Sequence, residues 1–180
     1  MKKLLILLFS LLISFNSYGG LFDKTVCVET DSQERGGLIY LPNKTKPFSG
    51  KNLCEYKSGQ YKSQGKIKKG VKNGKWIEWN ENGIKQTEAL YKDGEWFGET
   101  QYGYHQNGQK YSEESYNYLG WRSKLSLWFE NGQKQGEESY KGNSFELERD
   151  GKSTAWDKNG QIVSETNWKD GECISGDCPS

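Results

Sequence analysis

The sequence is poor in the residues that fill the interior of an ordinary globular domain. Of its 180 residues only 33% are hydrophobic, and aromatic residues (11 Tyr, 7 Trp and 7 Phe) make up a large share of these. Aliphatic side chains are therefore scarce, whereas glycine is abundant at 22 residues. Such a chain can bury aromatic rings locally, but it cannot fill a thick core between two layers. The composition favours a thin, elongated sheet.

Histidine and excess charge are nearly absent as well. The only histidine is His105, so any Ser–His or Cys–His catalytic pair would have to use it. It lies just before an Asn-Gly pair, where we expect an ordinary surface turn. We therefore predict no catalytic residue and no cofactor, and expect that the protein is not an enzyme. The formal net charge is only +1, so no general attraction to nucleic acid is expected.

The first 19 residues have the pattern of a secretory signal peptide. Met1, Lys2 and Lys3 precede an apolar run that ends near Phe15, and small residues follow. This run is too short for a membrane-spanning helix, which needs about 20 apolar residues. We predict cleavage after Gly19, a periplasmic or secreted protein and no transmembrane span after processing. A retained membrane anchor is the alternative.

Four cysteines lie near the two ends of the predicted mature chain: Cys27, Cys54, Cys173 and Cys178. In an exported protein an even number of cysteines indicates disulfides, and four cysteines allow three pairings. We favour Cys27–Cys54 and Cys173–Cys178, because each pair would close one end of the chain. A metal site is the competing interpretation. With one histidine and no close Cys-x-x-Cys pair, we expect no metal.

An internal repeat of about two dozen residues organises the rest of the chain. A small or polar residue followed by glycine recurs at Ser58-Gly59, Asn82-Gly83, Asn107-Gly108, Asn131-Gly132 and Asn159-Gly160. Asn-Gly is a strong hairpin signal, typical of type I′ turns with positive φ at both central residues. A second set of turns is expected near Asn73-Gly74, Gly98 and Asp150-Gly151.

Aligning the units on the turn glycine gives columns of similar residues. The fourth residue after the glycine is small, the fifth is Glu in four units (Glu88, Glu113, Glu137 and Glu165), and the eighth is aromatic in four (Tyr91, Tyr116, Tyr140 and Trp168). Because side chains alternate along a strand, the small and aromatic residues should share one face and the glutamates the other. The fold class is therefore all-β: an elongated single-layer antiparallel sheet of stacked β-hairpins. We expect an N-terminal extension at 20–45, five repeats and about ten strands at 46–172, and a disulfide-closed tail at 173–180.

These columns resemble those of the MORN-repeat family, in its shorter bacterial variant. The resemblance rests on Trp128-Phe129-Glu130-Asn131-Gly132-Gln133 with Glu137, Tyr140 and Gly142, and on Tyr104, Asn107-Gly108-Gln109, Glu113 and Tyr116. It covers about residues 46–172. Many proteins of this kind are described as YwqK-like antitoxins, that is, immunity proteins that neutralise a toxin. The resemblance thus implies a β-hairpin array that binds a partner protein.

Aromatic residues before the turns are the candidates for contact with a protein partner: Trp76, Trp79, Tyr104, Trp128 and Trp156. Exposed rings beside polar groups suit protein interfaces, and they also suit stacking on sugars. The eighth-position rings are instead expected to pack against their neighbours across the stack. The Glu column could supply paired carboxylates for glycosidic chemistry, but a solvated ladder with Lys85, Lys110 and Lys134 explains it better.

A basic segment offers a second candidate surface. Lys62, Lys66, Lys68, Lys69 and Lys72 lie in a stretch without acidic residues. They could contact anionic lipid or an acidic partner. Alternatively, they protect an edge strand against pairing with another chain.

The sequence thus predicts an exported, non-enzymatic repeat protein that binds another protein, with an antitoxin or immunity role as the leading possibility. The alternative is a scaffold of the cell envelope that binds peptidoglycan, another glycan or anionic lipid.

Overall fold

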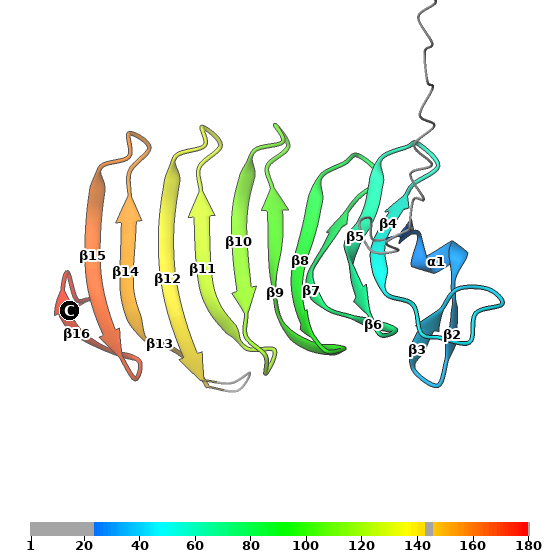
Figure 1. The fold of residues 1–180 in the computed structure, drawn as a ribbon. Helices are drawn as coiled ribbons and strands as arrows, with labels where there is room; N and C mark the ends of the chain where they lie inside the picture. Colours follow the sequence, from blue (N-terminus) through cyan, green and yellow to red (C-terminus); the bar gives the residue numbers. More distant parts are fainter. Residues whose placement is uncertain (1–23, 143–145, 180) are drawn as a thin grey trace, which may run out of the picture.

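A computed structural model describes residues 24–142 and 146–179. Within them, 14 strands form one long sheet, and the strands follow one another across it almost in sequence order (Figure 1). The predicted signal peptide at 1–19 lies outside the described residues, as do residues 20–23 of the predicted extension. This elongated single sheet confirms the predicted fold class.

Ten strands make five consecutive hairpins. They are β4 (Gly50–Glu55) with β5 (Tyr61–Lys68), β7 (Gly74–Trp79) with β8 (Lys85–Lys92), β9 (Glu95–Tyr104) with β10 (Lys110–Tyr116), β11 (Arg122–Trp128) with β12 (Lys134–Gly142), and β14 (Gly151–Trp156) with β15 (Ile162–Lys169). Each hairpin pairs antiparallel with the next, so the ladder runs without a break from β4 to β15. Two short strands, β6 (Val71–Lys72) and β13 (Leu147–Arg149), add to β5 and β12.

The Asn-Gly turns are not the predicted type I′ turns. In the turn after β9, His105 N–H donates to Gln109 O and Gly108 N–H donates to His105 O, which encloses a three-residue loop. Only the glycine has positive φ there, at 83°, because Asn107 stays in the ordinary region. This is a type I turn followed by a glycine bulge, and the same bonds recur in the other four hairpins.

Type I′ geometry occurs instead at the opposite ends of the strands. Asp93 and Gly94 have φ of 49° and 95°, and they connect Lys92 directly to its pairing partner Glu95. Lys69-Gly70 and Asp170-Gly171 repeat this arrangement. The turn expected at Gly98 was wrong, since Gly98 lies inside β9 at a β-bulge that leaves Phe97 unpaired.

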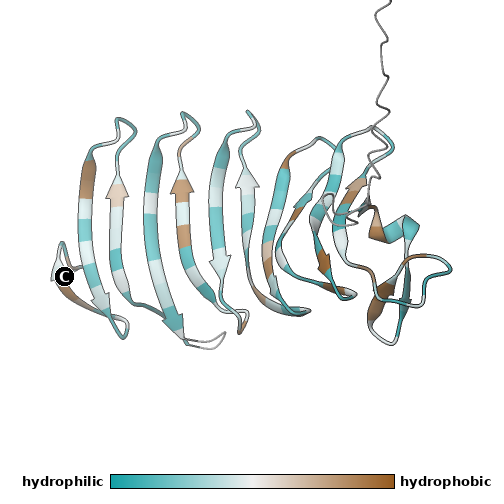
Figure 2. Cartoon of the chain, in the orientation of Figure 1, coloured by the Kyte–Doolittle hydropathy of each residue, from teal (hydrophilic) through white to brown (hydrophobic). Residues whose placement is uncertain are grey.

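The only hydrophobic core within the described residues lies at the N-terminal end. There β1 (Thr25–Val26) pairs parallel to β4, and α1 (Val28–Asp31) and the hairpin of β2 (Gln33–Arg35) with β3 (Leu38–Tyr40) follow. Val26 and Phe48 pack on Ile67 and Trp76 of the first hairpins. Elsewhere the strands are mostly hydrophilic, as Figure 2 shows. The N-terminal extension is therefore a cap that closes one end of the array.

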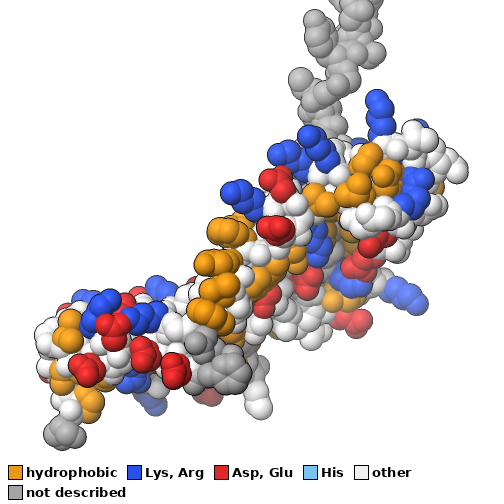
Figure 3. Space-filling model, turned by 90° about the horizontal axis from the view of Figure 1, so that it is seen from below, with side chains coloured by type: hydrophobic (Ala, Val, Ile, Leu, Met, Phe, Trp, Pro, Cys, Tyr) orange, Lys and Arg blue, Asp and Glu red, His pale blue; other side chains and the backbone are white. Residues whose placement is uncertain are grey.

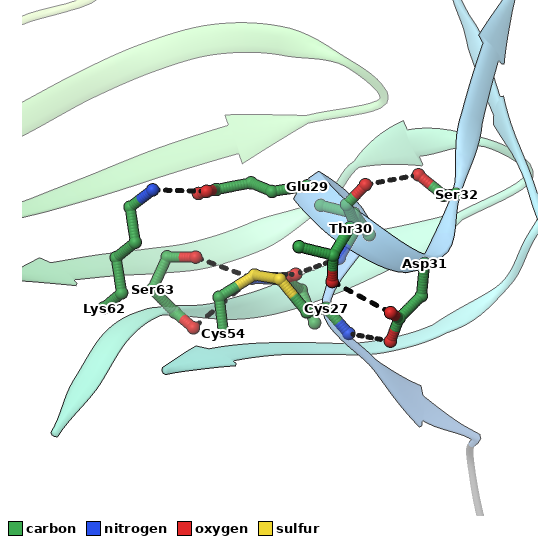
Figure 4. Close-up of a disulfide and its surroundings, with 10 residues drawn as sticks. Cys27, Glu29, Thr30, Asp31, Ser32, Cys54, Lys62 and Ser63 are labelled. Atoms are coloured by element: carbon green, nitrogen blue, oxygen red, sulfur yellow. Dashed lines mark hydrogen bonds and ion pairs between the residues drawn. A yellow bond between two sulfur atoms is a disulfide. The ribbon is translucent and has the colours of Figure 1, made fainter. Parts of the chain in front are cut away.

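Both predicted disulfides are present. Cys27–Cys54 joins the cap to β4, and Cys54 is only 1% exposed (Figure 4). Beside it, Asn52 accepts a hydrogen bond from Val28 N–H at 2.9 Å and donates to Ser63 Oγ at 3.0 Å. Cys173–Cys178 closes a short loop after β16 (Glu172–Gly176), the last strand of the sheet. One disulfide thus fixes the cap to the core, and the other shortens the exposed final edge strand.

Turn side chains link each hairpin to the next one. The Nδ2 of Asn107 donates to Glu130 O at 2.9 Å, and that of Asn131 donates to Lys158 O at 2.8 Å. In both turns the same side chain's Oδ1 accepts a hydrogen bond from the N–H of the second residue after it. The turn asparagine therefore closes its own turn and also joins neighbouring units, which explains why it recurs.

We expect the two disulfides to contribute unequally to stability. Replacing Cys27 and Cys54 together by serine should cost about 3 kcal/mol, because the crosslink closes a long loop and holds the cap on the core. The matched pair of changes, Cys173→Ser with Cys178→Ser, should cost roughly half as much. Urea denaturation of both variants measures this, and an equal or larger loss at the C-terminal pair would contradict the assignment.

The Asn131→Asp variant separates the two roles of the turn asparagine. Aspartate keeps the oxygen that accepts from Gln133 N–H but loses the Nδ2–H that donates to Lys158 O. We expect a loss of about 1 kcal/mol in the free energy of unfolding. Asn159→Asp is the control, because no later repeat follows its turn. The explanation fails if both variants lose the same amount.

Candidate functional site

The sheet presents two faces, which a regular bulge keeps distinct. We call the side of Ile67 and Trp76 the core face, and the side of Glu88, Glu113, Glu137 and Glu165 the charged face. In every hairpin the strand after the turn carries one extra residue, such as Gln86 between Lys85 and Thr87. This bulge lets Lys85 share a face with Glu88 although three positions separate them.

Every glutamate of the charged face has a lysine partner. The N···O distances are 2.7 Å for Lys75–Glu88, 3.3 Å for Lys85–Glu88, 2.5 Å for Lys110–Glu113, 3.1 Å for Lys124–Glu137 and 2.7 Å for Lys152–Glu165, and Lys134 also contacts Glu137. The hydrogen bond from Lys75, with help from Lys85, lowers the pKa of Glu88 despite its partial burial. The predicted ladder with Lys85, Lys110 and Lys134 is therefore present.

The same lysines lie over aromatic rings. The Nζ of Lys85 is 4.2 Å from the ring centre of Tyr102, and that of Lys110 is 3.9 Å from the ring centre of Trp128. Lys134 lies 5.4 Å from Trp156. These are cation–π contacts, so rings and ammonium groups alternate along the charged face. The rings are half-buried and keep some surface for a partner.

The five predicted contact aromatics do not form one surface. Trp128 and Trp156 belong to the alternating rows on the charged face, and Tyr104 and Trp79 are half-buried near the Asn-Gly turns. Trp76 is different, since it is only 4% exposed and belongs to the core. The expectation that Trp76 contacts a partner is corrected, because the cap covers its ring.

The core face carries the eighth-position rings, which contact cations as well as their neighbours. Tyr91 meets Trp76 edge-on at 6.5 Å, whereas Tyr140 lies 5.0 Å from the guanidinium of Arg122. Burial raises the pKa values of Tyr91 and Tyr140. The face also carries Glu114 and Glu138, so the expected separation into one apolar and one acidic face is only partly present.

The predicted basic surface is dispersed. Lys62 pairs with Glu29 of the cap (Figure 4), and Lys68 pairs with Asp93 at 3.8 Å. Lys72 lies between the rings of Trp76 and Tyr91 on the core face, where burial lowers its pKa. Lys69 occupies a turn, and Lys66 lies opposite Lys51 on the charged face. These lysines therefore do not make a single anion-binding patch.

An exposed apolar cluster, which the repeat columns did not predict, lies where the β8–β9 and β10–β11 turns meet. We call it the edge patch; its members are Leu90, Phe97, Tyr118 and Leu119. Phe97 and Tyr118 are 50% and 60% exposed, and their rings stack at 6.0 Å. Figure 3 shows hydrophobic side chains gathered in a band midway along this edge of the molecule. Tyr118 and Leu119 within an Asn-x-x-Gly turn were the available sequence signal.

The groups considered for catalysis all have structural partners. The Nε2 of His105 lies 3.0 Å from Trp128 O, and its ring contacts that of Tyr111 at 5.6 Å. The four glutamates are held by lysines, and all four cysteines are in disulfides. Within the described residues no cluster of three His, Cys, Asp or Glu side chains could hold a metal ion. The arrangement is that of a binding surface.

The Glu137→Gln variant tests the charged ladder through the pH dependence of stability. Burial acts to raise the pKa of Glu137, but hydrogen bonds from Lys134 and Lys124 outweigh it and hold the pKa below the usual 4.5. The pairs therefore contribute above about pH 4.5, and the contribution is lost as pH falls through the lowered pKa. The variant should lose about 0.5–1 kcal/mol at pH 7 and part of the acid-induced fall in Tm. Glu81→Gln, in an exposed turn, is the control; identical pH profiles for wild type and Glu137→Gln would contradict the ladder.

No helix within the described residues is both long and apolar enough to cross a membrane.

Comparison with known proteins supports the repeat assignment. A family model described as MORN repeat variant matches residues 72–93 and 149–170. The two stretches have equal length and include β7–β8 and β14–β15, respectively. A search of curated proteins gives no match to the chain. The chain thus contains two hairpins similar to the MORN repeat variant, set in an array of five.

Proposed function

We propose that the protein is an exported, non-catalytic binding protein that holds another protein against its edge patch. The observation that carries this proposal is the exposure of Leu90, Phe97, Tyr118 and Leu119 beside one another. Contiguous exposed apolar side chains of this kind mark interaction sites, whereas single ones need no explanation.

The repeat itself does not account for these residues. Phe97 occupies a bulge and Tyr118 a turn, so neither belongs to the columns that stack hairpins on one another. Both positions could hold a polar residue without disturbing the ladder. Their exposure costs solvation free energy, which a partner that covers the rings would recover.

The surroundings of the patch suit a protein interface. A shallow hollow of about 340 Å3 adjoins it on the charged face, lined by Leu90 and Phe97 together with Lys75, Glu88, Thr100 and Ser115. Apolar anchors beside a polar, charge-balanced rim are typical of protein–protein contacts. Charge balance also argues against a purely electrostatic partner such as nucleic acid.

Export is supported by two lines of reasoning. Two disulfides are typical of proteins in oxidising compartments, and the first 19 residues have the pattern of a signal peptide. Together with the resemblance to antitoxins, this suggests a toxin acting in the envelope as the partner. Neutralisation would be steric, with the edge patch covering the toxin's working surface.

A scaffold that binds peptidoglycan or another glycan is the second candidate. It is favoured by the alternating rows on the charged face, where Tyr102, Trp128 and Trp156 stand beside lysines. Such rings could stack on sugars, and the neighbouring charges could bind hydroxyl groups. Anionic lipid is less well supported, because the basic segment is dispersed.

Affinity capture from the native host with a paired variant tests the proposal. Phe97→Ser combined with Tyr118→Ser removes the stacked rings and should weaken capture of a stoichiometric protein partner about 100-fold, as expected for interface anchors. Ile162→Ser combined with Val163→Ser is the control, since these residues are equally exposed but lie away from the patch.

Three results would count against the proposal. One is equal loss of capture by both double variants, and another is unchanged capture by the patch variant. The third is retention on purified peptidoglycan without any protein partner, which would favour the glycan scaffold.

A further inference from the structure

Two places on the core face are equivalent by register but differ in one side chain. In the first, Lys72 pairs with Ile67 and Trp76 pairs with Ala89. In the second, Arg149 pairs with Tyr140 and Ser153 pairs with Thr166. The two stretches matched by the family model give the same correspondence, in which 72 aligns with 149 and 76 with 153.

At the first place, the chain's own indole fills the space above the sheet. The ring of Trp76 lies directly on Gly65, where a Cβ atom would meet it at 2.0 Å. The Nζ of Lys72 is 4.2 Å from this ring, and Tyr91 meets it edge-on at 6.5 Å. Residues of the cap, including Phe48 and Ile39, cover it.

At the second place, the flanking groups remain but the indole is gone. Arg149 takes the place of Lys72, and its guanidinium lies 4.9 Å from the ring centre of Trp168, which takes the place of Tyr91. Ser153 takes the place of Trp76. A cavity of about 350 Å3 results, within the size range of ligand pockets.

The floor and walls of this cavity combine small, apolar and polar side chains. Gly136, Ala155 and Ser164 leave the floor low, and Leu125 and Leu127 form an apolar wall. Asp177 and Pro179 of the C-terminal tail line it as well, so the tail held by Cys173–Cys178 borders the site.

Ser153 itself indicates that a ligand is missing. Its side chain is 9% exposed, and its Oγ is buried without a hydrogen-bond partner. Leaving a buried hydroxyl unpaired costs about 1–3 kcal/mol, so such groups are normally satisfied. Next to the cavity, Glu138 accepts from Arg149 at 2.9 Å and could accept from a ligand too.

We propose that this cavity binds an aromatic side chain, Trp or Tyr, of a protein partner. The ring would take the position that Trp76 occupies in the first repeats, next to Arg149 and Trp168. Its N–H or O–H would pair with Ser153 Oγ or the Glu138 carboxylate. The partner would also supply the cover that the cap provides over Trp76. Only the choice of a protein as the source of the ring rests on the function proposed above.

The direct probe is N-acetyl-L-tryptophanamide, with N-acetyl-L-leucinamide as the ring-free comparison. Titration followed by 15N–1H NMR should move the amide signals of Ser153, Thr166 and Trp168 saturably, with a dissociation constant on the order of 1 mM. The leucine derivative should bind about tenfold more weakly or not at all.

Ser153→Trp supplies the missing indole from the chain itself. We expect it to raise Tm or leave it unchanged and to weaken probe binding by at least about tenfold. Lys152→Trp is the matched control, because it places the same side chain one residue away on the charged face. That variant should bind the probe as the wild type does. If Ser153→Trp does not fold, Arg149→Ala replaces it, with binding expected to fall about fivefold through loss of the cation–π contact.

The proposal is overturned if the probe produces no saturable shifts at these residues, or if folded Ser153→Trp still binds it fully. Equal binding of the leucine derivative would also overturn it, because the cavity would then be only apolar. None of these outcomes depends on the edge patch, so this inference can fail while the patch variants still lose their partner.

Discussion

Main-chain hydrogen bonding from hairpin to hairpin is the interaction on which this structure depends. A single layer buries little apolar surface, and the only core within the described residues sits under the N-terminal cap around Ile67 and Trp76. Beyond it, each hairpin is held by the strand ladder, by Lys–Glu pairs and by turn asparagines such as Asn131 that reach the next turn. An isolated hairpin is marginal in water, so the neighbours supply its stability.

Candidate binding features occur where the repeat is broken. Phe97 is exposed because β9 carries an extra residue at a bulge, and Tyr118 because a lower turn has three residues in place of two. The cavity exists because Ser153 stands where an earlier repeat has Trp76. In an array of similar units, the positions that differ without harming the ladder are free to serve a partner.

The sequence was sufficient for the fold, because turn glycines and columns with a two-residue period fix both the hairpins and their number. It also favoured both disulfides found. The turn type was wrong, since Asn-Gly fits both a two-residue loop and a type I turn with a glycine bulge. Trp76 was misplaced because its burial depends on the cap, which is remote in sequence. The edge patch lay outside the columns, and the cavity at Ser153 requires the register between distant strands.

Equilibrium unfolding of one isolated hairpin is the most direct test of this account. A peptide spanning residues 122–142, which contains β11 and β12, should show little sheet by circular dichroism and no cooperative urea transition, whereas residues 24–180 should show both. A peptide that unfolds cooperatively with the same midpoint as the longer chain would mean that the units do not need one another, and would contradict the account.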